Sequence, residues 1–481
     1  MLSCDVVIFI TLFVTNVYAH RFFGFKQKYL LYSVNENEGF NLRRDVYIRI
    51  ANLIRVLREA SQYPLSDPNS SNYSTFDWVL VLPPWTQTFH WKHQNASSAL
   101  PQPWSKFFDL ESLRLFIPVI EFDDFLQIVS MDQSRPEVDI ALQVNQVPLS
   151  ENKREVKLDE PKFLPECGRF ACGDQNMPNI EMDPGNRTRV YFDHSSDEYA
   201  LKTSALYCLY GVLQAVELAP FLSRYIEQNP NIRTVFIGSA ENLINGVWSE
   251  WSQQYWTARR SMVFASHLTV LADSFRLKHL NSDDVSDQTT PPPSWLNRPW
   301  PQSPALGGPY FAIHWRRGDF PRSPSPYTAA MQTLQAIKQS IKFLEPFINE
   351  SSSLSIYLAT DADLEDCVEF QRLVAPHKVY RFIDKSLLPG EVAIIDQWIC
   401  AHARFFVGSV PSTFTFRIAE EREIIGFPSV TTFNSLCDVE GSEVVLKDDP
   451  LDSSNCEGLV PWTINLEPRY TIFASQVKYE L

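Results

Sequence analysis

"PYFAIHWRRGDF" occupies residues 309–320 and joins an apolar run to a cluster of charge. The apolar run has the length and character of a buried strand, and His314, Arg316 and Arg317 stand at its end. Charged residues at a strand end are expected wherever a strand reaches the surface, where they form salt bridges. The alternative is that the guanidinium groups are directed at an anion, and the surrounding sequence has to decide between the two.

The residues after this strand alternate between strand and helix patterns. Further apolar runs of strand length occur at 354–360 and 404–408. Segments of helix length lie at 329–344, 390–403 and 412–424. Strands that alternate with helices of this length predict a parallel sheet with helices on its faces.

The N-terminal half follows the same plan. Strand patterns at 29–34 and 78–82 flank an expected helix at 42–60. That helix carries an apolar stripe formed by Leu42, Val46, Ile50, Leu53, Ile54 and Leu57. Residues 287–309 hold seven prolines and no periodicity, which is typical of a linker between domains.

The predicted fold class is therefore α/β, with two Rossmann-like domains that face each other across a cleft. The expected organisation is a signal peptide (1–19), an N-terminal domain (20–286), a linker (287–309), a C-terminal domain (310–460) and a tail (461–481). Ligands of such sheets bind beyond the carboxyl ends of the strands. The loops expected there are 35–41, 314–320, 360–363 and 408–414, an arrangement typical of enzymes that use nucleotide sugars.

Composition narrows the class of protein. Hydrophobic residues make up 44% of the chain and the formal charge is -15, which fits a folded protein and argues against a nucleic-acid partner. The apolar run 6–14 is too short for a bilayer, which takes about 20 residues, and a small-x-small pattern ends at Ala19. We therefore expect a signal peptide and no membrane span.

The expected compartment is the lumen of the endoplasmic reticulum. The last four residues, Lys478 to Leu481, read KYEL and differ by one residue from the KDEL retrieval signal. Five glycosylation sequons, at Asn69, Asn72, Asn95, Asn186 and Asn349, agree with passage through that compartment.

An oxidising compartment favours disulfide bonds among the cysteines that follow the signal peptide. Cys437 and Cys456 flank a polar loop and are expected to pair. Cys208 is expected to pair with Cys167 or Cys172, and both alternatives stay open. Cys400 lies in an apolar helical segment, so we expect a free thiol in the core.

Several long strings resemble one family, the protein O-fucosyltransferases, and within it the branch that modifies thrombospondin type 1 repeats. The resemblance extends from about Tyr29 to Cys456, with weaker segments at 125–200 and 280–305. The strings that carry it are 30–57, 79–85, 258–268, 305–320 and 392–423. It implies a metal-independent GT-B fold that inverts the anomeric centre as it transfers fucose from GDP-β-L-fucose to a Ser or Thr hydroxyl.

The resemblance implies roles for the loop "NENEGFN". Glu38 matches the catalytic base, which removes the proton of the acceptor hydroxyl; the alternative from the residues alone is a solvated loop carboxylate. Asn37, Gly39, Phe40 and Asn41 match residues that contact the donor. Asn41 is also expected to be the N-cap of the helix that follows.

The resemblance places the leaving group at the opening motif. Arg316 matches the arginine that stabilises the departing diphosphate, with His314 and Trp315 as further donor-binding residues. Strand alternation puts Trp315 and Arg317 on the face opposite to His314, so Arg317 is expected to be structural and paired with Asp319.

Three further residues complete the expected donor site. Asp396 matches a residue that accepts hydrogen bonds from guanine, and the alternative is a buried ion-pair partner. Thr413 and Phe414 open the last helix, where hydroxyl and backbone N–H groups suit a phosphate. The alternative for that segment is a plain N-cap at Ser412 or Thr413.

Some features are assigned no chemistry or remain open. Asp361 and Asp363 form the Asp-x-Asp pattern of metal-dependent glycosyltransferases, but the pattern is common by chance and the resembling family needs no ion, so no metal site is expected.

The expected partners are GDP-fucose and folded thrombospondin repeats, and the expected state is a monomer. Trp85, Phe89 and Trp91 are interpreted as exposed-loop aromatics available to the acceptor.

Two alternatives for the function remain open at this point. The first is O-fucosylation of EGF-like repeats. The second is a non-catalytic luminal protein that binds repeats for quality control. Glu38 and Arg316 argue against the second alternative, because a protein that only binds has no use for a base.

Overall fold

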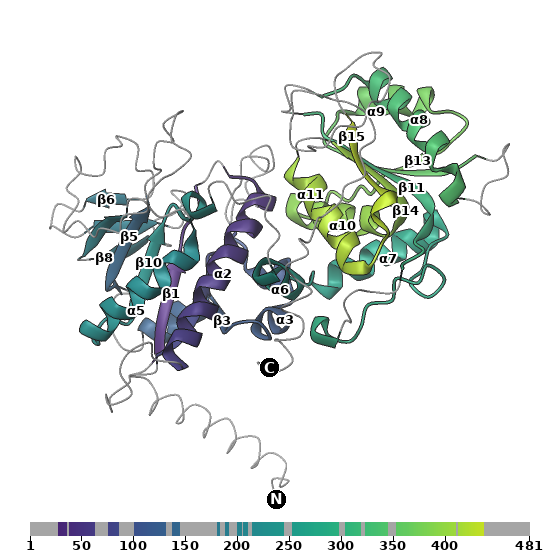
Figure 1. The fold of residues 1–481 in the computed structure, drawn as a ribbon. Coiled ribbons are helices and arrows are strands. Elements are labelled where there is room, and N and C mark those ends of the chain that lie inside the picture. The colour runs from purple at the N-terminus through teal and green to yellow at the C-terminus, as the bar shows by residue number, and fades with distance from the viewer. Residues whose placement is uncertain are drawn as a thin grey trace, which may run out of the picture. The chain divides into compact units, whose positions relative to one another are not determined.

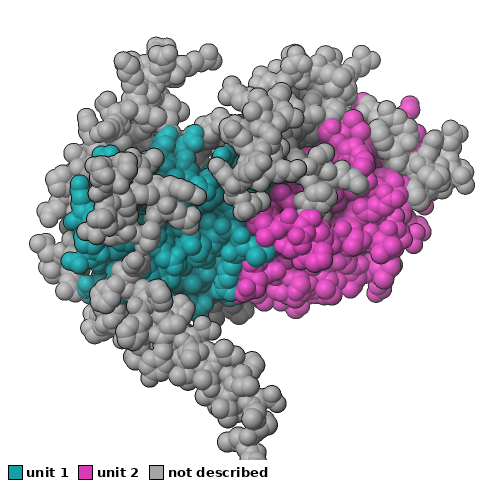
Figure 2. Space-filling model, turned by 60° about the horizontal axis from the view of Figure 1, so that its bottom comes forward, with its two compact units in different colours: residues 1–104, 113–250, 254–259 teal, residues 105–112, 251–253, 260–481 magenta. Residues whose placement is uncertain are grey.

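The computed structural model forms two compact units, which Figure 2 colours separately. The first unit comprises residues 1–104, 113–250 and 254–259, and the second comprises the remainder. The structure describes residues 27–35, 38–62, 76–85, 101–130, 137–144, 180–182, 188–191, 200–203, 205–209, 214–244, 253–297, 304–318, 323–344, 353–409 and 412–436.

A six-stranded parallel sheet forms the centre of the first unit. Its order is β3-β2-β1-β10-β5-β9. Strands β2 and β3 lie on one side of β1, and β10, β5 and β9 lie on the other, so the strand order reverses between β1 and β10. The strands are β1 (Gln27–Tyr32), β2 (Asp77–Leu82), β3 (Val119–Glu121), β5 (Ile140–Val144), β9 (Leu206–Leu209) and β10 (Thr234–Gly238). The predicted strands 29–34 and 78–82 are confirmed as β1 and β2.

Helix α2 (Phe40–Gln62) packs on this sheet through the predicted stripe. Val46, Ile50 and Leu53 are fully buried, as are Ile54 and Leu57. Each such side chain contributes about 1.5–3 kcal/mol to folding, which is why a helix with this spacing is held against a sheet. The helix begins one residue before the expected N-cap, so Asn41 lies within its first turn and the N-cap prediction is wrong.

Smaller elements complete the first unit. A four-stranded sheet of order β4-β8-β7-β6, which no sequence pattern predicted, lies in the region of weak resemblance. Its strands are β4 (Glu137–Val138), β6 (Ile180–Met182), β7 (Thr188–Tyr191) and β8 (Ala200–Thr203). The helices are α3 (Leu110–Arg114, which crosses the unit boundary), α4 (Phe122–Ser130), α5 (Ala219–Gln228) and α6 (Gln253–Ser261), and the short turns include η6 (Ala240–Ile244).

The second unit contains a five-stranded parallel sheet of order β13-β12-β11-β14-β15. In chain order this is 3-2-1-4-5, the order of a Rossmann fold without its sixth strand, with the reversal between β11 and β14. The strands are β11 (Gly308–Trp315), β12 (Ser355–Thr360), β13 (Lys378–Tyr380), β14 (Ala403–Ser409) and β15 (Thr432–Leu436). The α/β class with two Rossmann-like units is confirmed.

Helices cover both faces of this sheet (Figure 1). Trp315, Ile313 and Phe311 of β11 pack in one core with α8 (Pro326–Leu344) and α9 (Leu364–Leu373). The opposite face carries α7 (Ser266–Leu280), α10 (Pro389–Ala401) and α11 (Thr413–Ile425). Three predicted helices, 329–344, 390–403 and 412–424, are confirmed as α8, α10 and α11. Among the described residues, no helix combines the length and apolar character that a membrane crossing requires.

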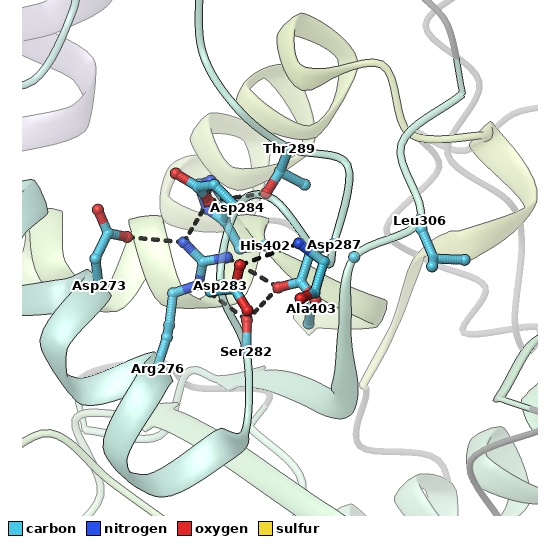
Figure 3. Close-up of polar contacts among 12 residues, drawn as sticks. Asp273, Arg276, Ser282, Asp283, Asp284, Asp287, Thr289, Leu306, His402 and Ala403 are labelled. Atoms are coloured by element: carbon cyan, nitrogen blue, oxygen red, sulfur yellow. Dashed lines mark hydrogen bonds and ion pairs between the residues drawn. The ribbon is translucent and has the colours of Figure 1, made fainter.

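A buried arginine fixes α7 within the second unit (Figure 3). Nη1 of Arg276 lies 2.7 Å from Oδ1 of Asp273 and 2.8 Å from Oδ1 of Asp284, and Nη2 lies 3.1 Å from Oδ2 of Asp287. Thr289 donates to the same Asp284 oxygen. Because Asp287 and Thr289 belong to the segment expected to be a linker, the structure differs from the predicted division: the second unit takes in residues from Arg260 onward.

Candidate functional site

The reversal in strand order marks a site in the second unit, because ligands of open parallel sheets bind at the carboxyl ends of the strands beside that point. Strands β11 and β14 flank it. Ser409, at the end of β14, accepts a hydrogen bond from the backbone N–H of Arg316 at 3.0 Å and donates one to the backbone oxygen of His314 at 2.9 Å. This side chain connects the two strand ends, and the sequence pattern had not singled it out.

His314 lies buried at this point and is fixed from α11. Its Nδ1 lies 2.7 Å from Oγ1 of Thr415, and its ring stacks on Phe414 with centroids 4.3 Å apart. Oγ1 of Thr415 also accepts a hydrogen bond from the N–H of Ser409 at 3.1 Å. Burial lowers the pKa of His314 to about 3, so the imidazole is neutral at physiological pH.

Gly408 is the sequence signal that could have identified Thr415. A Cβ added to Gly408 would lie 2.1 Å from Cγ2 of Thr415, so only glycine lets α11 approach β14 this closely. Thr413 is confirmed as the first residue of α11, with Ser412 as N-cap. The backbone N–H groups of the first turn of a helix have no partner within the helix and attract anions.

Arg316 follows β11 and its guanidinium is partly exposed. Nη1 lies 2.9 Å from Oδ2 of Asp361, the residue that follows β12. Oδ1 of the same carboxylate accepts from the backbone N–H of Arg317 at 2.6 Å. The Arg317 side chain pairs with Asp366 at 2.6 Å. Asp319, the predicted partner, lies outside the described residues, so that pairing stays a prediction.

Trp315 is directed away from the site. Its side chain is fully buried in the core on the α8 and α9 face, and its indole N–H donates to the backbone oxygen of Pro324. The opposite faces expected for His314 and Trp315 are confirmed. Consequently, the prediction that Trp315 binds the donor can hold only for its main chain.

Asp396 lies on α10, partly buried, and accepts a hydrogen bond at Oδ1 from the hydroxyl of Tyr357 on β12. Burial raises the pKa of Asp396 to about 7, while the Tyr357 hydrogen bond and the charge of Arg381 act to lower it. The ring of Phe275 packs edge-on against Tyr357 with centroids 5.7 Å apart. A carboxylate beside aromatic rings is a suitable environment for a nucleobase that donates N–H groups.

The first unit has its own reversal, between β1 and β10, and Glu38 lies in the loop after β1. The backbone N–H of Glu38 donates to the oxygen of Asn35 at 3.0 Å, and Nε of Arg43 donates to the backbone oxygen of Glu38 at 3.2 Å. Burial raises the pKa of the Glu38 carboxyl. Asn37, predicted to contact the donor, lies outside the described residues.

A second carboxyl group, which the sequence pattern did not reveal, stands at the same reversal. Glu241 lies in η6 directly after β10, and its Oε2 accepts from the N–H of Asn35 at 3.1 Å. Burial raises the pKa of Glu241 to about 7, and the charge of Glu38 contributes in the same direction. The two glutamates are therefore electrostatically coupled.

Three predicted donor-binding residues sit at the start of α2. Gly39 precedes the helix, and the buried ring of Phe40 packs on Trp85 with centroids 4.7 Å apart. The side-chain oxygen of Asn41 accepts from Nη1 of Arg44 at 3.3 Å. Trp85 is only 2% exposed, so the interpretation of this residue as an exposed acceptor contact is wrong: it fills the core between Phe40 and Trp104.

The remaining predictions concern metal and thiols. Within the described part of the chain, no group of three or more His, Cys, Asp or Glu side chains is arranged to hold a metal ion. Cys400 is confirmed as a buried free thiol, and Cys367 is also free and buried. The signal peptide, the sequons, Phe89, Trp91 and the expected disulfides lie outside the described residues or side chains.

The chain resembles known proteins over most of its length. The family GDP-fucose protein O-fucosyltransferase matches residues 29–425. GDP-fucose protein O-fucosyltransferase 2 of Caenorhabditis elegans is 37% identical over 414 residues, covering 86% of this chain and 87% of the relative. The human protein of that name is 36% identical over 417 residues, with 86% of each chain covered. The solved apo-form of POFUT1 is 14% identical, with a TM-score of 0.49 over 84% of this chain and 97% of that chain.

Proposed function

Since this chain belongs to the GDP-fucose protein O-fucosyltransferase family and is a glycosyltransferase, we propose that it transfers fucose from GDP-β-L-fucose to a Ser or Thr hydroxyl of folded thrombospondin type 1 repeats, with inversion. The family membership supports the donor and the reaction class. The resemblance of the sequence strings to the thrombospondin-repeat branch supports the acceptor. We further propose that the chain acts as a monomer without a metal ion.

The observation that carries the proposal is the place of Arg316. Its main chain stands at the strand reversal of the second unit, where its N–H donates to Ser409 beside the residues that open α11, and its guanidinium pairs with Asp361 after β12. When the bond between fucose C1 and the β-phosphate oxygen breaks, negative charge accumulates on GDP. A planar guanidinium that stays charged, together with the N–H groups of the first turn of α11, stabilises that charge.

Glu38 is the proposed base. The acceptor oxygen attacks C1 from the face opposite to GDP, which inverts the anomeric centre, and its proton passes to the Glu38 carboxylate. Proton removal of this kind contributes about 10²–10⁴-fold to a rate. Burial raises the pKa of Glu38 above that of an exposed glutamate, and a more basic carboxylate is the better proton acceptor.

Asp396 is the proposed reader of guanine. An ionised carboxylate accepts hydrogen bonds from the adjacent ring N–H and amino group of guanine, a pairing that cytosine and uracil cannot supply in the same geometry. The hydroxyl of Tyr357 holds one carboxylate oxygen, and its hydrogen bond favours the ionised form.

The test is transfer to two acceptors. Two reactions are set up, each with residues 20–481, GDP-fucose and a chelator. One contains a folded thrombospondin repeat and the other a folded EGF-like repeat, and the mass of each acceptor is measured by mass spectrometry. A gain of one deoxyhexose on the thrombospondin repeat alone is the expected result. Gain on the EGF-like repeat alone would assign the other acceptor. No gain on either repeat, from a sample that still binds GDP, would favour a non-catalytic repeat-binding protein.

We also propose that the protein resides in the lumen of the endoplasmic reticulum, on the support of the apolar segment 6–14 and the five sequons. Glycans on a resident protein of that compartment stay sensitive to endoglycosidase H. Resistance of the cellular protein to that enzyme would contradict the proposed residence.

A further inference from the structure

The Asp-x-Asp pattern, to which the sequence alone assigned no chemistry, has two separate roles in the structure. Asp361 is the first residue after β12, and β12 pairs directly with β11. Oγ1 of Thr360 donates to the backbone oxygen of Trp315 at 2.6 Å, which joins the two strand ends just before both charged segments begin. Asp361 therefore stands beside Arg316 for reasons of sheet register.

The carboxylate of Asp361 contacts the arginine segment at two points. Oδ2 lies 2.9 Å from Nη1 of Arg316, and Oδ1 accepts from the backbone N–H of Arg317 at 2.6 Å. The carboxylate of Asp361 thus fixes both the backbone that follows β11 and the guanidinium of Arg316. Gly318 leaves room for this contact, because a Cβ added there would lie 3.0 Å from Oδ2 of Asp361.

Asp363, in contrast, serves the helix that follows. Its side chain caps α9 by accepting from the backbone N–H of Asp366 at 2.8 Å. This hydrogen bond satisfies one of the N–H groups that every helix leaves open in its first turn. The two aspartates of the motif therefore have different partners: Asp361 binds Arg316, and Asp363 caps α9.

We propose that Asp361 is a positioning residue for Arg316: its carboxylate fixes the guanidinium at the end of β11 in the orientation that meets the departing diphosphate. The inference rests on the proposed function. A guanidinium presents several N–H donors in a rigid fork, so an ion pair through Nη1 is compatible with a second anion on the same group. Misplacement of a catalytic group by about 1 Å costs on the order of 10²-fold in rate, so the orientation that Asp361 gives to Arg316 affects turnover.

This role acts on turnover more than on donor binding. The guanidinium interacts most strongly with the charge that develops as GDP departs, so a misdirected fork lowers kcat. Loss of the Asp361 carboxylate has two opposite effects on the affinity for GDP. The misdirected guanidinium binds the diphosphate more weakly, but a negative charge that repels the diphosphate is also removed. We therefore expect the kcat of Asp361→Asn to fall about 10–100-fold while the Kd for GDP changes by less than about threefold.

The experiment compares Asp361→Asn with Asp363→Asn and Gly318→Ala in the full chain. Asp363→Asn should keep kcat, since it affects only a helix cap. Gly318→Ala keeps every charge but displaces Oδ2 of Asp361, so its kcat should fall in the same direction, by less. Thermal midpoints establish that each variant is folded, and wild-type transfer tests the proposed function separately.

A double-mutant cycle with Arg316→Lys decides whether Asp361 acts through Arg316. Lysine keeps the charge but lacks the fork, so Asp361→Asn in that background should lower kcat by less than about threefold. Additive losses would overturn the inference, as would a kcat for Asp361→Asn within about threefold of wild type. Equal losses in both aspartate variants together with inhibition by a chelator would assign the pair to a metal instead.

Discussion

Oγ1 of Thr415 lies 2.7 Å from Nδ1 of His314, so the first turns of α11 fix the imidazole at the end of β11. The same oxygen accepts from the N–H of Ser409. One hydroxyl therefore holds the three strand and helix ends that meet at the reversal of the sheet. The arrangement depends on Gly408, whose missing side chain gives Thr415 its place.

Thr415→Val tests this hydroxyl, because valine keeps the shape and removes the polar atom. The change leaves a buried ring nitrogen and a buried N–H without their partner, which costs about 1–3 kcal/mol of unfolding free energy. We expect a lower denaturant midpoint and a raised KM for GDP-fucose. Thr269→Val on α7, where the hydroxyl bonds only within its own turn, is the control. Equal behaviour of the two variants would show that the hydroxyl does not fix His314.

Glu241→Gln tests the coupled carboxyl pair of the first unit. The glutamine oxygen can still accept from the N–H of Asn35, so the variant removes charge and keeps the hydrogen bond. A carboxyl group whose pKa is raised to about 7 on folding releases its proton first in the unfolded chain, so its contribution to stability falls from about pH 4.5 to about pH 7. The variant should therefore gain stability relative to wild type between pH 5 and pH 8, as measured by thermal midpoints.

The same variant should simplify the pH dependence of kcat/KM. Two coupled carboxyl groups release protons in two steps, and the step near pH 7 belongs mainly to Glu241. We expect the acid limb of the wild-type profile to extend to about pH 7 and that of Glu241→Gln to end at lower pH, with one inflection. A profile that does not change would mean that Glu241 and Glu38 do not share their titration.

Arg276→Met tests the buried network of the second unit (Figure 3). Methionine fills part of the volume but leaves Asp284 and the buried Asp287 without their counter-charge. Removing one partner of a buried ion pair costs about 3–5 kcal/mol, and denaturant unfolding should show a loss of that size. Arg372→Met removes an exposed pair with Glu369 and should leave the midpoint unchanged. A small effect at Arg276 would mean that the network is open to water.

Local pattern predicted the elements well and their tertiary partners poorly. Strands β11, β12 and β14 and helices α8, α10 and α11 were predicted because each carries a complete apolar period, and strand alternation correctly separated His314 from Trp315. The shorter elements α9, β13 and β15 were not predicted. The pairing of Asp361 with Arg316 was not predicted, because it depends on which strands are neighbours in the sheet. Trp85 was misread for the same reason: its burial is created by Phe40 and Trp104, which are distant in sequence.

The hydroxyl of Tyr357 donates to Oδ1 of Asp396, so its removal should change the titration of that carboxyl group. The groups that face this carboxyl are Tyr357, Arg381 and the thiol of Cys400 on its own helix. Burial holds the pKa of Asp396 at about 7, and the hydroxyl acts to lower it. In Tyr357→Phe that contribution is lost, so the pKa rises and more of the carboxyl is protonated at neutral pH.

A protonated carboxyl group cannot accept both guanine N–H groups, so the affinity of Tyr357→Phe for GDP should fall. The loss at pH 6.5 follows from the smaller ionised fraction of the carboxyl group in the variant, at about tenfold for each unit by which its pKa rises. The loss should shrink at pH 8.5, where the carboxyl ionises in wild type and variant alike, and calorimetric titration with GDP at the two pH values measures it. Tyr310→Phe removes a buried hydroxyl that donates to the backbone of Ile399 and should leave GDP affinity unchanged at both pH values. If Tyr357→Phe loses the same affinity at pH 6.5 and pH 8.5, the hydroxyl acts through packing. The protonation of Asp396 would then not control the affinity for GDP.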